Sequence, residues 1–218
     1  MKLETRVLRY IAMLSPRNLA QKKYIDVLSS KIPVVIGTGP AGTGKTLLAC
    51  HAGSKALISG QVQRLILTRP AVSVDEQHGF LPGTVEKKMD PWTRPMFDVL
   101  NRYMSVKKVN ELVYDRKIEI CPLAYMRGRT FDNAWIIGDE MQNSTPSQMK
   151  MLLTRIGENS KMIIAGDMQQ HERGFEKNGL SDLVSRIGQN SIDIYHIKFS
   201  EDDVVRNQVI KEILNMYK

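Results

Sequence analysis

One glycine-rich segment of eight residues constrains this chain more than any other feature. Residues 39 to 46 read Gly-Pro-Ala-Gly-Thr-Gly-Lys-Thr and fit the pattern G-x-x-x-x-G-K-[ST]. A short apolar run, Val34 to Gly37, precedes the segment, and a helical pattern, Thr46 to Ser59, follows it. Glycines in such a turn let backbone N–H groups point at phosphate oxygens, and the start of the following helix adds positive potential. The segment therefore predicts a phosphate-binding loop between a strand and a helix.

Each residue of this loop has an expected role in binding ATP with magnesium. Lys45 is expected to reach the β- and γ-phosphates, and Thr46 offers a hydroxyl to the metal ion. The alternative is a glycine-rich turn that carries a surface lysine, which the flanking strand and helix disfavour. The remaining positions are expected to surround the phosphates with their backbone: Gly39, Pro40, Ala41, Gly42, Thr43 and Gly44.

Two adjacent carboxylates end a second apolar run, Trp135-Ile136-Ile137-Gly138-Asp139-Glu140. Ligands of open α/β sheets bind at the carboxyl ends of the strands, where this pair would lie. We expect Asp139 to hold magnesium through water, and Glu140 to orient and deprotonate the attacking water. The pair favours hydrolysis over phosphoryl transfer to another substrate. A pair of solvated loop acids is the alternative.

A third apolar run, Met162 to Ala165, leads into Gly166-Asp167-Met168-Gln169-Gln170. In P-loop ATPases that use a catalytic glutamate, an extra strand lies between the P-loop strand and the Asp-Glu strand and carries a polar sensor. Gln170 would then face the γ-phosphate, with Asp167 bracing it or the water. Taken alone this signal is weak, because a Gly-Asp turn after a strand is common.

Short apolar runs alternate with helical patterns along the chain, which predicts an α/β fold with a mostly parallel sheet and helices on both faces. Thr145, Pro146 and Gln148 indicate a capped helix start. Residues 71–95 hold several glycines and prolines and show no clear period, which indicates a long loop or small insertion. The expected strands are Val34 to Gly37, Leu65 to Thr68, Ile118 to Cys121, Trp135 to Gly138, Met162 to Ala165 and Ile192 to Phe199. The expected helices are Leu19 to Leu28, Thr46 to Ser59, Pro146 to Arg155, Leu180 to Ile187 and Asp203 to Tyr217.

Length and charge bound the remaining possibilities. With 218 residues the chain is expected to form a single domain over residues 1–218. A formal charge of +8 favours a polyanionic partner, although a solvated basic surface gives the same charge. The sequence contains no stretch of about twenty uncharged apolar residues that would span a bilayer, so we expect a cytoplasmic protein with no membrane partner.

Taken in this order, the three motifs resemble the PhoH-like ATPase family, which is itself similar to the nucleotide-binding half of superfamily 1 helicases. The resemblance runs from about Leu19 to Ile213 and implies a RecA-like P-loop NTPase fold. Further segments match the family: Gln21, Leu81-Pro82-Gly83-Thr84, Glu86-Lys87, Tyr125-Met126-Arg127-Gly128-Arg129-Thr130, Asp139-Glu140-Met141-Gln142-Asn143, Leu153-Thr154-Arg155-Ile156-Gly157 and Asp203-Val204-Val205-Arg206.

The resemblance also implies roles for residues outside the phosphate-binding loop. Gln21 looks like the glutamine that reads the adenine edge, and Gln170 like the γ-phosphate sensor. Arg206 looks like a charge-neutralising arginine; its alternative is a helix-surface arginine paired with Asp202 or Asp203. Two positions depart from the family pattern: Asn207 stands where histidine is frequent, and Gly138 replaces a bulkier apolar residue.

Three arginines are candidates for contact with nucleic acid. Thr68-Arg69-Pro70 follows a strand much as a nucleic-acid-contacting segment does in superfamily 1 enzymes, and Arg127 and Arg129 follow another. They could clamp a phosphate backbone. Equally, they could brace the nucleotide or a neighbouring subunit.

Together these features predict magnesium-dependent binding and hydrolysis of ATP, coupled to RNA or single-stranded DNA as in helicase-like proteins. A single RecA-like domain cannot form the two-domain cleft of a helicase, so the resemblance implies that Arg206 enters from the next subunit of a homo-oligomer, and a hexameric ring is the family-based expectation. Two alternatives stay open. One is a nucleotide-gated nucleic-acid-binding module with negligible hydrolysis, and the less favoured one is a small-molecule kinase.

Overall fold

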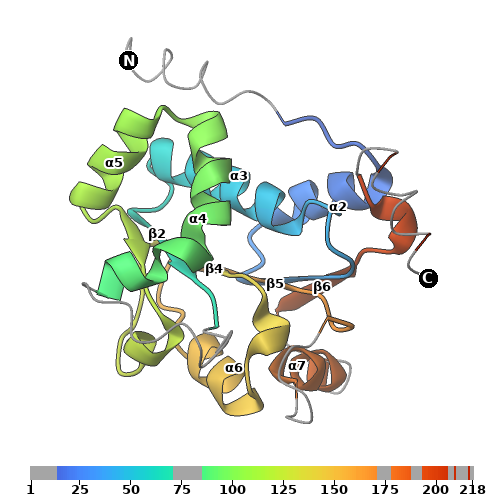
Figure 1. Ribbon diagram of the computed structural model, residues 1–218. Coiled ribbons are helices and arrows are strands. Elements are labelled where there is room, and N and C mark those ends of the chain that lie inside the picture. Colours follow the sequence, from blue (N-terminus) through green and yellow to red (C-terminus); the bar gives the residue numbers. More distant parts are fainter. Residues whose placement is uncertain are drawn as a thin grey trace.

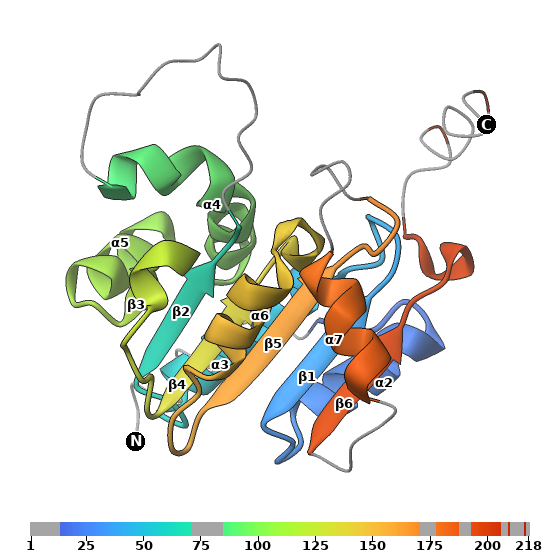
Figure 2. The same ribbon diagram turned by 90° about the horizontal axis from the view of Figure 1, so that it is seen from below.

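A six-stranded sheet forms the centre of the computed structural model, which describes residues 14–70, 85–170, 178–187 and 193–205, with positions 209 and 216. The strand order is β3-β2-β4-β5-β1-β6, and every neighbouring pair is parallel. Figure 2 shows the strands side by side in this order. Their bounds are β1 Val34–Thr38, β2 Arg64–Thr68, β3 Ile118–Ile120, β4 Ala134–Gly138, β5 Lys161–Gly166 and β6 Ile194–Lys198.

Helices cover both faces of this sheet (Figures 1 and 2). One face packs against α2 (Leu19–Leu28), α3 (Lys45–Ile58), α4 (Val85–Tyr103) and α5 (Val106–Tyr114). The other packs against α6 (Pro146–Leu153) and α7 (Gly179–Ile187). Neighbouring residues of a strand enter different cores, as Val35 and Ile36 do, because successive side chains point to opposite faces. Burial on both faces explains why the central strands β1, β4 and β5 are largely apolar.

The predicted fold class is confirmed, and so is the position of the extra strand. β5 pairs with β1 on one side and with β4 on the other. In the ladder, Thr38 lies opposite Gly166, and Gly138 lies opposite both Thr68 and Ile164. The central strands therefore end at one level, which brings the residues that follow them to a common edge.

Residues 71–95 were interpreted as a long loop or a small insertion, and the structure shows that the second half of this segment is helical. Residues 71–84 lie outside the described part, but α4 begins at Val85 and runs through Pro91 and Pro95. Prolines inside a helix normally break it. Here the helix continues beyond them into Met96 and Leu100, which are fully buried in the core shared with α3, and this packing outweighs the local preference.

The helix expected from Asp203 to Tyr217 does not begin at Asp203; most of its range lies outside the described residues, and the described positions 209 and 216 are helical. A short 3-10 helix, η4 (Glu201–Asp203), is closed by the Asp203 carboxylate, which accepts hydrogen bonds from Ser200 N and Oγ. Val204 is then extended, and Val205 N donates to Gly42 O at 3.0 Å. Over the first three residues of the expected helix, the chain is thus non-α-helical and is tied to the phosphate-binding loop through Val205.

The capped start of one helix was predicted correctly. Thr145 caps α6, and its capping box with Gln148 is complete. Helix α5 had not been predicted. Two further 3-10 helices, η2 (Leu123–Met126) and η3 (Met141–Asn143), follow the carboxyl ends of β3 and β4. Within the described residues, no helix is long and apolar enough to cross a bilayer.

Candidate nucleotide site

The loop between β1 and α3 has the backbone of a phosphate cradle. Gly39, Gly42 and Gly44 all have positive φ, at 136°, 86° and 91°. A side chain at Gly39 would also collide with the backbone carbonyl of Phe199. Gly44 is the N-cap of α3, so the loop leads directly into a helix start, where unpaired N–H groups favour anions.

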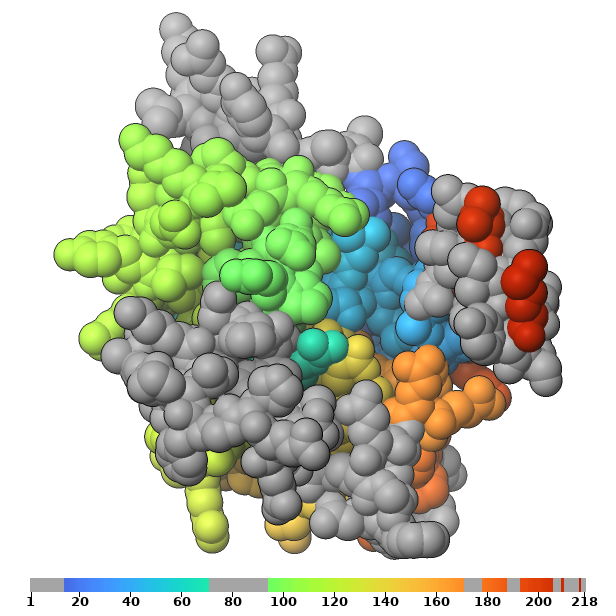
Figure 3. All heavy atoms as spheres, viewed as in Figure 1, coloured from blue at the N-terminus to red at the C-terminus, as the bar shows by residue number. Residues whose placement is uncertain are grey.

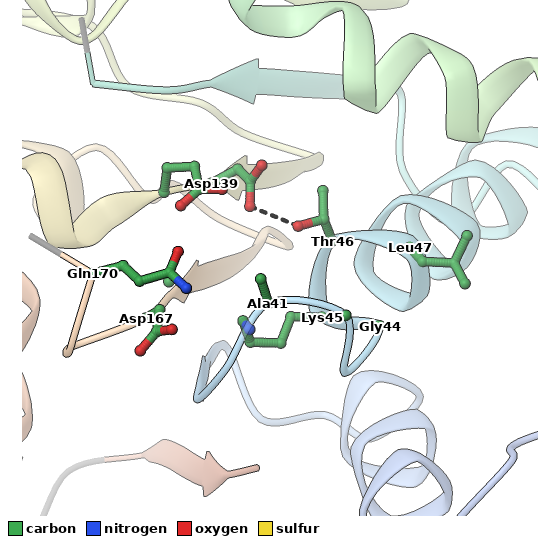
Figure 4. A pocket seen from close by; sticks show the side chains of 11 residues that line it. Ala41, Gly44, Lys45, Thr46, Leu47, Asp139, Asp167 and Gln170 are labelled. Carbon is green, nitrogen blue, oxygen red and sulfur yellow. Dashed lines mark hydrogen bonds between the residues drawn. The ribbon is translucent and has the colours of Figure 1, made fainter. Parts of the chain in front are cut away.

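Lys45 and Thr46 open helix α3 on the side of this loop. Lys45 is 8% exposed, and its Nζ donates to Gly39 O at 2.6 Å and Pro40 O at 2.8 Å. Thr46 Oγ1 donates to Asp139 Oδ1 at 2.7 Å, which joins the loop to the end of β4 (Figure 4). The two motifs recognised in the sequence are therefore in direct contact.

Asp139 and Glu140 directly follow β4, and the backbone of Glu140 turns sharply. Asp139 is buried, and its N–H continues the sheet ladder by donating to Thr68 O at 3.0 Å. Glu140 has φ 51° and ψ 38°, a left-handed conformation that is uncommon for a glutamate and frequent at functional sites. This turn is what puts the second carboxylate beside the first.

Burial sets the electrostatics of Asp139. Desolvation is the largest cause that raises the pKa of its carboxyl, and the negative charge of Glu140 acts in the same direction. Arg69 and the hydrogen bond from Thr46 oppose this shift. A cation placed beside a buried carboxylate stabilises the negative charge that burial disfavours.

Both oxygens of the Glu140 carboxylate have partners. Arg69 NH2 contacts Oε1 at 2.8 Å, and Gln142 Nε2 donates to Oε2 at 2.5 Å. The same Arg69 nitrogen lies 3.7 Å from Asp139 Oδ2. Arg69 was predicted as a nucleic-acid contact, with bracing of the nucleotide as one alternative; the structure places it on the two acids.

A cavity of about 220 Å³ lies where these elements meet. Gln170 and Asp167, from the loop after β5, face the phosphate-binding loop across it (Figure 4). The surfaces of residues near 40, 140 and 170 adjoin on one face of the molecule (Figure 3). The lining consists of Ala41, Gly42, Gly44, Lys45, Thr46, Leu47, Asp139, Glu140, Gly166, Asp167 and Gln170.

Gln21 lies against the loop without lining this cavity. Its Nε2 donates to Thr43 O at 3.0 Å, and its Oε1 accepts from Arg17 N at 2.9 Å. The side chain is buried, and a Cβ at Gly44 would lie 3.0 Å from its Nε2. Gln21 therefore supports the shape of the loop, and its predicted contact with adenine remains a prediction.

The other predicted arginines have separate environments. Arg129 pairs with Glu119 through two nitrogens, at 2.5 and 3.0 Å, and its guanidinium lies 4.6 Å from the centre of the Phe131 ring. Arg127 is exposed. Arg206 lies outside the described residues. The structure thus gathers the loop, Asp139, Glu140 and Gln170 into one site, and leaves Arg127 and Arg129 apart from it.

Sequence reasoning missed two contacts to Glu140. Gln142 belongs to a segment that was recognised, but it was given no role of its own, and Arg69 was assigned to a different partner. The available signal was position: Arg69 follows β2, and β2 is the neighbour of β4 in the sheet. That signal needs the strand order, which the sequence pattern does not contain.

Solved structures with a similar fold differ widely in sequence. The large terminase of a thermophilic bacteriophage aligns with 100% of this chain and 50% of its own, with a TM-score of 0.51 and 12% identity. The SWI2/SNF2 ATPase core of Sulfolobus solfataricus, solved in complex with dsDNA, aligns with 88% of this chain and 46% of its own, with a TM-score of 0.50 and 11% identity. At such identities the likeness shows the fold, a P-loop NTPase domain.

Relatives in sequence are much nearer. A PhoH-like protein of Mycobacterium leprae (strain TN) is 45% identical over 93% of this chain, and Protein PhoH of Escherichia coli (strain K12) is 42% identical over 92%. The chain spans 58% and 57% of their respective lengths, so these relatives are longer proteins. The family model described as PhoH-like protein matches residues 13–218. By this match and these identities, the chain belongs to the PhoH-like protein family.

Proposed function

We propose that this chain binds ATP with magnesium and hydrolyses it. One observation carries the proposal: the hydrogen bond of 2.7 Å from Thr46 Oγ1 to Asp139 Oδ1, inside a cavity that Lys45 and Glu140 also line. A candidate phosphate-binding lysine, two candidate oxygen ligands for a metal ion and a candidate general base thus lie around one cavity. These are the parts that phosphoryl transfer to water requires.

The oxygen pair at this cavity suits magnesium. Mg²⁺ prefers oxygen ligands, keeps several waters and is usually held by one or two protein groups together with substrate phosphates. Within the described residues, no group of three His, Cys, Asp or Glu side chains could hold a metal by itself. A metal ion at Thr46 and Asp139 would therefore arrive with the nucleotide, and it would neutralise charge on the β- and γ-phosphates.

The protein's own groups then divide the work of hydrolysis. Lys45 contacts the β- and γ-phosphates as a fixed positive charge. Glu140 accepts a proton from water while the water oxygen bonds to the γ-phosphorus, and the bond from that phosphorus to the β-phosphate oxygen breaks. Gln170 contacts the γ-phosphate from the loop after β5.

Phosphate release from ATP with magnesium tests this proposal. In Glu140→Gln, turnover is expected to fall by about a hundredfold or more while ATP binding is retained, because only the base is lost. The matched control is Glu158→Gln, which makes the same chemical change at an exposed position outside the cavity. If the wild-type protein binds ATP without hydrolysing it, the proposed hydrolase activity is rejected, and the nucleotide-gated nucleic-acid-binding module is favoured.

Coupling to single-stranded nucleic acid is the second part of the proposal. Tyr125, 59% exposed, and the exposed Arg127 follow the carboxyl end of β3, two positions apart. An aromatic ring on which a base can stack, next to an arginine that can pair with a phosphate, is a usual combination for binding single strands. The charge of +8 supports the same kind of partner. Arg129 is committed to Glu119 and is not part of this proposed surface.

A matched pair of variants tests the nucleic-acid contact. Lys117 is an exposed basic residue just before β3, so it lies at the opposite end of the same strand from Arg127. Arg127→Ala is expected to weaken binding of a fluorescent oligouridine and to reduce the salt slope by about 1, and Lys117→Ala is expected to do neither. Equal losses of binding in the two variants would mean that binding depends only on the overall charge of the protein. If the wild type does not bind the oligouridine, single-stranded nucleic acid is rejected as a partner.

A homo-oligomer with Arg206 acting across the subunit interface is the third part of the proposal. The described chain reaches the phosphate-binding loop at Val205, one residue earlier in the sequence. Mixing Arg206→Ala with Glu140→Gln protein tests action between subunits. Recovery of turnover above both single variants would support it, whereas a monomer in the presence of ATP and magnesium would contradict it.

A further inference from the structure

Gln142 joins the two polar strand ends of the site. It lies in η3, is 2% exposed, and its Nε2 donates to Glu140 Oε2 at 2.5 Å. Its Oε1 accepts from Asp167 N at 3.1 Å. One buried amide therefore spans from the carboxylate after β4 to the first residue after β5.

The orientation of this amide is fixed by its partners. A flipped amide would place its oxygen against the Glu140 carboxylate and its N–H₂ group against the Asp167 N–H, so both contacts would become repulsive. The space is fixed as well, because a Cβ at Gly166 would lie 2.5 Å from Gln142 Oε1. Gln142 is thus held in one position and one orientation.

Asp167 passes this constraint to the loop that bears Gln170. Gln169 N donates to Asp167 Oδ1 at 3.0 Å, and Gln170 N donates to Asp167 O at 3.2 Å. The backbone of the loop is therefore organised around Asp167, whose own N–H is bound by Gln142. A displacement of the loop would move the amide, and with it the Glu140 carboxylate.

We infer that Gln142 is a positioning residue that holds the Glu140 carboxylate in register with the Gln170 loop. The inference rests on the proposed function, because it assigns Glu140 to water activation and Gln170 to the γ-phosphate. A general base must stay within hydrogen-bond reach of its water, and small displacements of catalytic groups are costly. Gln142 thereby makes the position of the base depend on the loop that contacts the γ-phosphate.

Steady-state kinetics with Gln142→Met provide the first test, since methionine keeps the length of the side chain and removes both hydrogen bonds. We expect kcat to fall by about ten- to a hundredfold, with KM for ATP changed by less than about threefold. Ser144→Ala is the control: it removes a buried hydroxyl that donates to Met141 O at 2.6 Å in the same turn. Its kcat should stay near wild type even where its melting temperature falls.

A double-mutant cycle separates positioning from general support of the fold. If Gln142 acts through Glu140, then Gln142→Met should change the residual single-turnover rate less than about twofold in a Glu140→Gln background. A purely structural role predicts the same loss in both backgrounds, which would overturn the inference. If the methionine variant does not fold, Gln142→Asn, one methylene shorter, replaces it with the same expectation.

The controls distinguish two kinds of failure. A wild-type chain that does not hydrolyse ATP would remove the proposed function. A wild-type chain that turns over ATP, together with a Gln142→Met variant of equal kcat, would remove only the role of Gln142.

Discussion

Two lysines at opposite ends of the sheet are buried to the same degree. Lys45 follows β1 at the carboxyl end, Lys161 begins β5 at the amino end, and each is 8% exposed. Each ammonium donates to two backbone carbonyls. For Lys45 these are Gly39 O and Pro40 O, at 2.6 and 2.8 Å; for Lys161 they are Val27 O and Ser30 O, at 3.1 and 2.7 Å.

What differs is the surroundings of the two ammonium groups. Lys45 lines a cavity shared with Asp139, Glu140 and Asp167, so its charge faces the place where phosphates are proposed to bind. Lys161 Nζ closes the carbonyl end of α2 and lies 5.8 Å from the centre of the Trp135 ring. Lysines of equal burial thus have a proposed ligand-binding role at the carboxyl end of the sheet and a helix-capping position at the amino end.

The largest effect should come from replacing the lysine at the carboxyl end. Lys45→Met is expected to lower kcat/KM for ATP by about a hundred- to a thousandfold, because a positive charge directed at the transferred phosphate is lost. Phosphate release measures the loss, and thermal unfolding should show that the variant is folded. Lys161→Met is the matched control, and its kcat/KM should remain within about twofold of wild type. Equal losses of kcat/KM in the two variants would contradict the different roles given to Lys45 and Lys161.

Lys161→Met, which is expected to leave kcat/KM near wild type, should nevertheless destabilise the fold. Lys161→Met is expected to lower the free energy of unfolding by about 1–2 kcal/mol, because it removes two hydrogen bonds that end α2. Urea unfolding followed by circular dichroism measures the change. An unchanged midpoint would contradict a net stabilising contribution of Lys161 to the end of α2.

The sequence was a good guide to the carboxyl end because its signals there are local. A glycine pattern, a strand and a helix start are adjacent in the chain, so Lys45 and Thr46 could be assigned before the fold was known. The apolar runs before Asp139 and Asp167 likewise identified two strand ends, and the order β1-β5-β4 was predicted correctly from the strand arrangement of P-loop ATPases that use a catalytic glutamate.

Contacts between strand ends were harder to predict. The pairing of Arg69 with Glu140 depends on β2 being the neighbour of β4, and on the left-handed backbone of Glu140, which no residue preference indicates. Lys161 directly precedes an apolar run and resembles a flanking surface lysine until α2 is placed beneath it. Helix α4 was missed because its prolines were weighed locally, whereas its buried face is defined by distant partners.

A third experiment asks whether the carboxyl end lowers the stability of the fold. Burial raises the pKa of Asp139, so ionising its carboxyl costs more in the folded, ligand-free protein than in the unfolded chain. Asp139→Asn keeps an oxygen that can accept from Thr46, and it is expected to increase the free energy of unfolding by about 1 kcal/mol while turnover is lost. Urea unfolding without nucleotide measures this change. A destabilised variant would show that the Asp139 charge supports the fold.

The smallest effect concerns the pH dependence of Lys161. Desolvation lowers the pKa of this lysine from 10.5 to about 8 in the folded protein. Below about pH 8 the Lys161 side chain is charged in the folded and in the unfolded protein. Its contribution to the free energy of unfolding therefore does not change with pH in this range. Between about pH 8 and the unfolded pKa, the unfolded chain binds more protons, and stability therefore rises with pH.

Comparison of wild type with Lys161→Met isolates this term, because the other titrating groups are common to both proteins. From about pH 7.5 to about pH 9.5, the free energy of unfolding of wild type should gain up to about 1 kcal/mol relative to the variant. The gain is expected to stay small because the two carbonyl acceptors favour the charged ammonium and oppose the effect of burial. Identical pH dependence in the two proteins would mean that Lys161 keeps an ordinary pKa. Burial of Lys161 to the same degree as Lys45 would then not disfavour the charge of its ammonium group.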